Sequence, residues 1–166
     1  MSRAFVNEDA GNDRPDLPEL PVPPGPNIVT PRGLADLQDR ISRRQADLAA
    51  LKARPDRLDK LPEAAAERDL RWLEARLKAA VVIDPAAHDL TEVAFGLLVT
   101  VADENGVETT YEITGEDEAD ATRNRIAPGS PLARALFGAQ VGDVVTWNRP
   151  AGAVELEILG IAHADP

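Results

Sequence analysis

The chain has 166 residues, no cysteine, 43% hydrophobic residues and a formal net charge of -11 at pH 7. The absence of cysteine excludes disulfides, thiol catalysis and cysteine-ligated metal centres. The acidic balance disfavours independent binding of DNA or RNA, because nucleic-acid phosphates would be repelled. The apolar runs fall far short of the about 20 residues that span a bilayer, and the N-terminus has no apolar stretch of the signal-peptide kind. We therefore expect a cytoplasmic protein that does not contact membranes.

The first 29 residues form an acidic, proline-rich leader. Six prolines lie from Pro15 to Pro26, with only three branched apolar residues among them. Proline at this density favours an extended polyproline II chain, and so little apolar surface cannot offset the entropy of ordering. Residues 1–29 are therefore predicted to be disordered, and the alternative is a docking peptide for a partner.

Residues 30–83 have the pattern of an antiparallel helical hairpin. Thr30 followed by Pro31 is a helix-start signal, and apolar residues then recur at spacings of three and four until Pro55 disfavours further helix. A second run with the same rhythm resumes after Pro62. Such narrow apolar seams suit the pairing of two helices in a coiled coil. About 20 residues per arm at ~1.5 Å per residue would give a rod of roughly 30 Å.

Charge divides the chain into three parts. Residues 1–31 carry a net charge of -3, residues 32–78 carry +3 from 12 basic and 9 acidic residues, and residues 79–166 carry -11. The hairpin is thus basic, and its apolar seam is interrupted at Arg44 and Gln45. A basic rod can enter an acid-lined channel, with electrostatic attraction raising the association rate. The alternative is a solvated hairpin whose charges form pairs along each helix.

From residue 84 the periodicity changes from helical to strand-like. Four strand-like runs occur, at Phe95–Ala102, Val107–Ile113, Val144–Trp147 and Val154–Ile161. Asn105-Gly106 between the first two is a strong hairpin-turn signal, and Ser130-Pro131 opens a short helix. Residues 84–166 therefore predict a small domain with a mainly antiparallel sheet and one short helix, and the whole chain is of the α+β class.

The polar residues of the chain do not form a catalytic pattern. Three serines and two histidines occur without a Gly-x-Ser-x-Gly or His-x-x-His spacing, and the histidines are interpreted as surface or packing residues. The acidic run Glu116–Asp120 lacks the glycine and the bidentate glutamate of an EF-hand, and it is interpreted as a solvated loop. We expect no cofactor of the chain's own.

One run in the C-terminal domain carries a family pattern. Residues Ile126–Leu136 read Ile-Ala-Pro-Gly-Ser-Pro-Leu-Ala-Arg-Ala-Leu, and Val-Gly-Asp-Val-Val follows at 141–145. With the helix start at Thr30 and the strand and acidic loop of Tyr111–Asp120, this run resembles the bacterial GreA/GreB family of transcript cleavage factors over residues 30–163. The resemblance implies an FKBP-like C-terminal domain that binds the RNA polymerase core at the rim of its secondary channel. The hairpin would then be inserted into that channel.

The resemblance also implies a role for the tip of the hairpin. In the family, two acids of a Gly-Asp-x-x-Glu-Asn-Ala motif hold the second Mg²⁺ of the polymerase and its attacking water. This chain lacks the motif, but Asp56 and Asp59 keep the three-residue spacing at which two acids can share one hard cation. They are the candidate catalytic and metal-binding residues, and the Mg²⁺ would be shared with RNA polymerase. The alternative is that both are ordinary solvated acids of a helix–helix turn.

The same resemblance places the polymerase contact at the start of the short helix. The candidate polymerase-binding residues are Gly129, Ser130, Pro131 and Arg134. The alternative interpretation of Ser130-Pro131 is a helix cap followed by proline.

These observations together predict a monomeric Gre-type elongation factor with a short basic hairpin that modulates elongation or transcript cleavage. It would have no enzymatic activity beyond stimulating the polymerase's own RNA cleavage. Because the arms are shorter than is usual in the family, one alternative is a non-cleaving regulator of the Rnk type, which blocks the channel and competes with Gre factors. Another alternative is an interaction module that never contacts polymerase.

Overall fold

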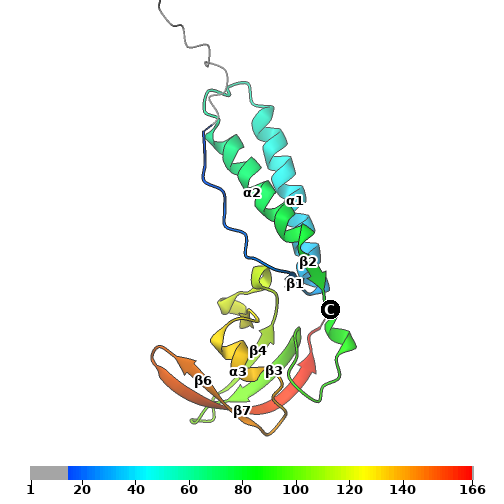
Figure 1. Cartoon of the computed structure of the whole chain (residues 1–166), viewed down its shortest axis with the longest axis vertical. Coiled ribbons are helices and arrows are strands. Elements are labelled where there is room, and N and C mark those ends of the chain that lie inside the picture. The colour runs from blue at the N-terminus through cyan, green and yellow to red at the C-terminus, as the bar shows by residue number, and fades with distance from the viewer. Residues whose placement is uncertain (1–14, 166) are drawn as a thin grey trace, which may run out of the picture.

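Two helices form the hairpin, and both begin and end close to the predicted signals. The computed structural model describes residues 15–165. Helix α1 (Pro31–Lys52) starts at the N-cap Thr30, whose side-chain oxygen accepts a hydrogen bond of 3.0 Å from the backbone N–H of Gly33. Helix α2 (Leu61–Lys78) follows a tip loop and returns alongside α1 (Figure 1). The predicted pair of helices is confirmed.

The seam between α1 and α2 is narrow and carries one polar bridge. Leu37 and Ile41 of α1 pack with Leu70 and Leu73 of α2 in one buried cluster. Beyond it, where the apolar pattern of α1 is interrupted, Arg44 Nη2 reaches Asp69 Oδ2 on the other helix at 2.6 Å. An ion pair between the two helices thus takes the place of an apolar contact at this point of the seam.

A short parallel sheet clamps the base of the hairpin. Strand β1 (Asn27–Val29) precedes α1 and strand β2 (Ala80–Val82) follows α2, with Asn27 opposite Ala80 and Val29 opposite Val82. This pairing was not predicted, because a three-residue strand has too few residues to show a period. The chain therefore enters and leaves the hairpin at one place.

Residues 15–29 differ from the disordered leader expected for residues 1–29. They are extended along the hairpin from near its tip to its base (Figure 1), and the last three form β1. Leu17 and Leu20 are half-buried there. The expectation weighed the apolar surface of the leader alone, whereas the hairpin offers it a partner surface. Residues 1–14 lie outside the described residues.

The C-terminal part is a curled sheet around one short helix. Its strands within residues 15–165 are β3 (Leu97–Ala102), β4 (Glu108–Ile113), β5 (Arg125–Ile126), β6 (Val144–Arg149) and β7 (Gly152–His163). They lie in the order β5-β4-β3-β7-β6. Helix α3 (Pro131–Leu136) packs against the curl, and the predicted α+β class is confirmed.

The sheet is mixed rather than wholly antiparallel. Its β3–β4, β3–β7 and β6–β7 pairs are antiparallel as expected, but β4 and β5 are parallel. The reason is the connection between them, which contains two single-turn 3₁₀ helices, η2 (Glu116–Glu118) and η3 (Ala121–Arg123), and the left-handed residue Asn124. These turns carry the chain back toward the beginning of β4, so that β5 runs in the same direction as β4 when the two pair.

The core of this domain is aliphatic and lies between α3 and one face of the sheet. Leu132 and Leu136 of α3 meet Val99 and Val101 of β3 and Ile158 of β7, all buried. The linker from the hairpin contains a further 3₁₀ turn, η1 (Pro85–Ala87). No helix within the described residues is long and apolar enough to cross a membrane.

Candidate functional site

The tip loop of the hairpin holds both predicted metal-binding aspartates, at the end farthest from the sheet (Figure 1). Asp56 Oδ1 accepts a hydrogen bond of 3.0 Å from the backbone N–H of Leu58, and Asp59 Oδ1 accepts one of 2.9 Å from that of Leu61. Each carboxylate therefore shapes the turn through one oxygen. Both side chains are exposed, so the second oxygen of each faces solvent.

Two arginines of the tip are held by partners other than the aspartate carboxylates. Arg57 donates two hydrogen bonds to the Glu63 carboxylate, at 2.8 and 2.7 Å. Arg54 donates to the backbone carbonyls of Leu51 and Asp59, at 3.1 and 3.2 Å. The hydrogen bonds from Arg57 hold the pKa of Glu63 below its ordinary range, so this glutamate is charged at neutral pH.

The two tip acids are too few to form a metal site by themselves. Within residues 15–165, no group of three or more His, Cys, Asp or Glu side chains is placed to hold a metal ion. Mg²⁺ prefers six oxygen ligands, often with one or two carboxylates from one protein and the rest from water or a partner. Asp56 and Asp59 fit the smaller share of such a set. The prediction of a shared Mg²⁺ therefore remains a prediction.

The predicted docking residues lie at the start of α3, whose Leu132 and Ala133 are buried in the core. Ser130 caps α3, its side-chain oxygen accepting a hydrogen bond of 3.2 Å from the backbone N–H of Ala133. Gly129, Pro131 and Arg134 are exposed, while the residues between them on α3 are buried beneath. Among the described residues, no ion pair engages Arg134. The geometry thus brings the four residues together as one exposed corner.

A buried polar joint, which sequence reasoning missed, connects the hairpin to the sheet domain. The side chain of Arg76, near the end of α2, is only 2% exposed. Its Nε lies 2.8 Å from Asp117 Oδ2, and its Nη2 donates to Asn27 Oδ1 at 2.6 Å. Asn27 in turn donates to Asp117 at 3.1 Å and to the carbonyl of Arg76 at 3.2 Å. The buried charges are therefore paired and hydrogen-bonded, as burial requires.

A second group of contacts holds the start of α1 on the same acidic loop. Glu118 accepts hydrogen bonds from the backbone N–H groups of Thr30 and Gly115, both at 3.1 Å, and from the Thr30 hydroxyl. Arg32 Nη2 lies 2.6 Å from Glu112, a residue of β4 that also pairs with Arg125 at 3.1 Å. Both ends of the hairpin are thus fixed to one edge of the sheet domain.

The interpretation of Glu116–Asp120 as a solvated loop was wrong for Asp117 and Glu118, while Glu116 and Asp120 are solvent-accessible as expected. Glu118 is buried in the joint and the Asp117 side chain is only 10% exposed, because the hairpin base supplies the donors that such shielded carboxylates need. One signal in the sequence could have indicated this. Arg76 follows Leu73 by one turn on the seam face of α2, where a basic residue needs an acidic partner from elsewhere.

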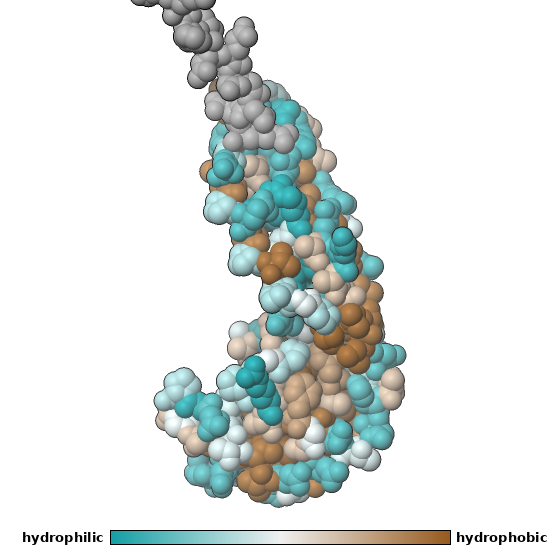
Figure 2. All heavy atoms as spheres, viewed as in Figure 1, coloured by the Kyte–Doolittle hydropathy of each residue, from teal (hydrophilic) through white to brown (hydrophobic). Residues whose placement is uncertain are grey.

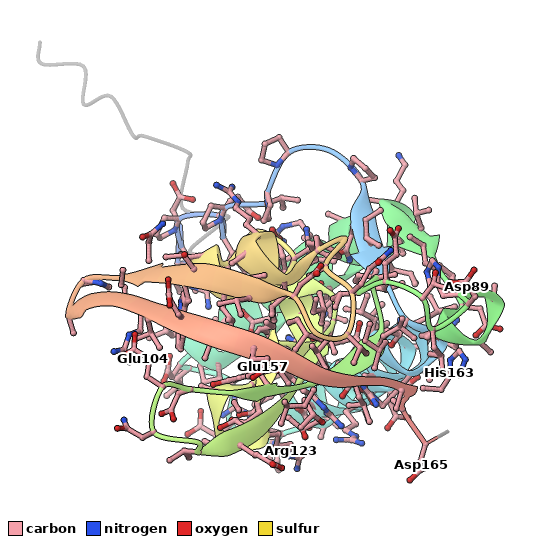
Figure 3. All side chains as sticks on the ribbon, turned by 90° about the horizontal axis from the view of Figure 1, so that it is seen from below. Asp89, Glu104, Arg123, Glu157, His163 and Asp165 are labelled. Carbon is pink, nitrogen blue, oxygen red and sulfur yellow. The ribbon has the colours of Figure 1, made fainter. Side chains whose placement is uncertain are left out.

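Within residues 15–165, the charged residues labelled in Figure 3 do not gather at one place. His163, at the end of β7, and the labelled Glu104, Arg123 and Glu157 lie apart over the lower side of the sheet domain (Figure 3). The hairpin surface is mostly hydrophilic in Figure 2, and hydrophobic residues gather where β2 meets the sheet domain. Val81 and Val82 of β2 are among the exposed apolar side chains.

Comparisons with known proteins agree with this architecture. A family model described as the C-terminal domain of transcription elongation factor GreA/GreB matches residues 87–163. Transcription elongation factor GreB of Neisseria meningitidis is 44% identical over 98 residues, 58% of this chain and 60% of that protein. GreA of Pseudomonas putida is 42% identical over 99 residues, 58% of this chain and 62% of that protein. The chain thus spans about three-fifths of these relatives.

Solved structures give the same family names. The GreA factor homolog Gfh1 of Thermus thermophilus covers 82% of this chain with 98% of its own, at 23% identity and a TM-score of 0.39. A GreA/GreB factor of Nitrosomonas europaea covers 82% of this chain with 99% of its own, at 20% identity and a TM-score of 0.42. The names of the curated relatives give no support to the Rnk-type alternative.

One relative extends the similarity through the hairpin. GreA of Ralstonia nicotianae is 33% identical over 157 residues, which is 81% of this chain and 96% of that protein. The resemblance seen in residues 30–163 is confirmed, and the chain belongs to the GreA/GreB family of transcription elongation factors.

Proposed function

We propose that this protein binds the RNA polymerase core at its secondary channel and inserts the α1–α2 hairpin to modulate elongation. The observation that carries the proposal is the family relationship, which extends over both the hairpin and the sheet domain. The geometry supports it. The hairpin projects from the sheet domain as a rod, and the buried joint of Arg76, Asp117 and Glu118 holds that rod in one direction.

The exposed corner at the start of α3 is the proposed docking surface. Gly129 has room for contact, since nothing lies within 4 Å of where a Cβ would be. Arg134 offers a charged donor that is not engaged elsewhere among the described residues, and Ser130 holds the helix start in place. A rigid corner with one free guanidinium suits recognition of an acidic surface on a partner.

The tip aspartates are the proposed link to RNA cleavage. Asp56 and Asp59 would each contribute a free carboxylate oxygen to a Mg²⁺ that the polymerase holds. A bound Mg²⁺ lowers the pKa of its water and stabilises charge on a reacting phosphate. The aspartates themselves would hold the ion and accept a hydrogen bond from that water. The protein would then assist the polymerase and would not be an enzyme by itself.

Polymerase binding is tested with an Arg134→Glu variant and an Arg149→Glu control. The two changes alter charge equally, but Arg149 stacks on Trp147 near the β6–β7 turn and is outside the proposed corner. We expect Arg134→Glu to weaken binding to the core polymerase by about tenfold or more, as loss of a central charged contact does. Equal binding by both variants would refute the docking assignment.

Transcript cleavage is tested in backtracked elongation complexes with an Asp56→Asn, Asp59→Asn variant. The control is Asp36→Asn, Glu74→Gln, which removes the same charge from exposed hairpin positions away from the tip. Shortened RNA with the control but not with the tip variant would support the metal-holding assignment. Binding without shortening would refute it and leave a protein that occupies the channel.

A further inference from the structure

Residues 15–26 form a strap that runs beside the hairpin before the chain enters β1 (Figure 1). Prolines recur at every third position from Pro15 to Pro24, a spacing that matches the three residues per turn of polyproline II. Leu17 and Leu20, also three apart, are half-buried, whereas Pro18, Pro21 and Pro24 are exposed. The strap therefore turns its leucine edge toward the helices and its proline edge toward solvent.

The surface of α2 that receives the strap has the chemistry of a proline-peptide groove. The indole N–H of Trp72 donates a hydrogen bond of 3.0 Å to the carbonyl of Pro21. Arg71 pairs with Glu19 at 2.5 Å. The guanidinium of Arg40 lies 5.7 Å from the centre of the Trp72 ring. An aromatic donor with flanking cations is the arrangement that binds acidic, proline-rich peptides in extended form.

The contacts of the strap are few and weak. Glu19 and Arg71 are 62% and 54% exposed, and an ion pair this open contributes little to stability. The Trp72 hydrogen bond is exposed too, so water can take the place of either partner. A cavity of about 510 Å³, lined by Leu20, Arg44, Trp72 and their neighbours, lies between the strap and the helices. The strap therefore rests on the hairpin without filling its groove.

The end of the strap has a pivot and a fixed anchor. Gly25 has a φ of +85°, which glycine adopts without strain, and nothing lies within 4 Å of where its Cβ would be. Two residues later Asn27 is buried in the joint, and Val29 is buried in the hairpin core. The chain before Gly25 can therefore leave the groove while β1 stays paired.

We propose that the strap is a displaceable cover, which masks the basic flank of the hairpin and lowers its affinity for polymerase until it lifts. Asp16 and Glu19 give the strap a charge of -2, which offsets part of the +3 on residues 32–78, so lifting the strap makes the rod more basic. A basic rod is attracted to an acidic channel, and an extra chain along one flank also widens it. This inference rests on the proposed function.

The test ties the strap down in a chain that has no natural cysteine. In the full-length Glu19→Cys, Arg71→Cys variant the ion pair is gone, and this form is called the released form. A bis-maleimide reagent that joins the two cysteines then ties it to α2. A mono-maleimide on the same cysteines is the matched control, since it adds similar bulk without a tie.

Two measurements are made on the tied, released and unmodified proteins. Hydrogen exchange of the Trp72 indole N–H by NMR reports whether the strap is seated, with the Trp147 indole as internal reference. Binding to core polymerase is measured at several salt concentrations. We expect fast Trp72 exchange and about tenfold tighter, more salt-dependent binding for the released form than for the tied form.

The outcomes separate this inference from the proposed function. If tied and released forms bind polymerase with equal affinity, or if the tied form binds more tightly, the cover is refuted while the proposed function stands. If no form binds polymerase, the proposed function fails and the cover fails with it. If Trp72 exchange is the same in tied and released forms, the strap does not leave the groove and the cover is again refuted.

Discussion

Gly33 is the residue with the least room in the joint. It lies in the first turn of α1, and a Cβ there would overlap the Glu118 carboxylate that caps Thr30. Gly33→Ala would therefore push Glu118 off its donors despite alanine's higher helix propensity. We expect a loss of about 1–3 kcal/mol in the free energy of unfolding, measured by urea denaturation. Gly129→Ala, at an open position, is the control and should change stability little; equal effects of the two would contradict this packing.

The Arg57–Glu63 pair at the tip predicts a pH effect of defined sign. Hydrogen bonds from Arg57 lower the pKa of Glu63. Because the folded-state pKa lies below the unfolded one, the contact stabilises the hairpin at higher pH, and this contribution is lost as pH falls through the folded-state pKa. In Arg57→Gln, the NMR titration of the Glu63 carboxyl should move upward. Lys52→Gln should leave that titration where it is, since Lys52 pairs with Glu67 instead.

The stability of the hairpin as an element depends on a thin apolar seam. Leu73 is buried in it, whereas Leu58 in the tip loop is 93% exposed. Leu73→Ala should destabilise the hairpin by about 2–5 kcal/mol, because it leaves a cavity between two helices that share few other apolar contacts. Leu58→Ala should change stability by less than about 0.5 kcal/mol. Thermal unfolding followed by circular dichroism at 222 nm measures both, and similar midpoints would show that the seam does not hold the helices together.

Local signals explain which elements could be predicted. The helix starts at Thr30 and Ser130 were readable because the cap and the following proline are adjacent in sequence, and the Asn105-Gly106 turn for the same reason. The apolar rhythm of α1 and α2 was readable because it repeats over many turns. Strands β1, β2 and β5 were missed, since each is two or three residues long and is defined by its partner.

The candidate site also has a part that could be predicted from the sequence and a part that could not. The tip position of Asp56 and Asp59 and the exposed corner at Ser130 follow from the order of elements along the chain. The burial of Asp117 and Glu118 does not, because it depends on donors supplied by the hairpin base, far away in sequence. A run of acids looks solvated until those donors are known.

At the scale of the whole molecule, Arg76 determines how the hairpin sits on the sheet domain. Arg76→Met would leave Asp117 buried without its cation, and we expect a cost of about 3–5 kcal/mol. The hairpin and the sheet domain should then tumble more independently, which residual dipolar couplings detect as two alignment tensors in place of one. Arg43→Met, which removes a fully exposed pair with Asp39, is the control. A single shared tensor in Arg76→Met would show that the joint does not depend on this residue.

The parallel pairing of β1 with β2 also has a consequence for the order of folding. The strands are separated by the whole hairpin, so pairing them first would close a long flexible loop at a high entropic cost. If the two helices pair first, starting at the tip, Asn27 and Ala80 are brought side by side. The contacts between the helices then offset most of the entropic cost of closing the loop. We therefore expect the clamp to close after the hairpin has formed, and Asn27 makes its joint contact with Arg76 only when the clamp is closed. Opening the clamp alone would thus remove Asn27 from the joint, while the Arg76–Asp117 pair and both helices stay in place.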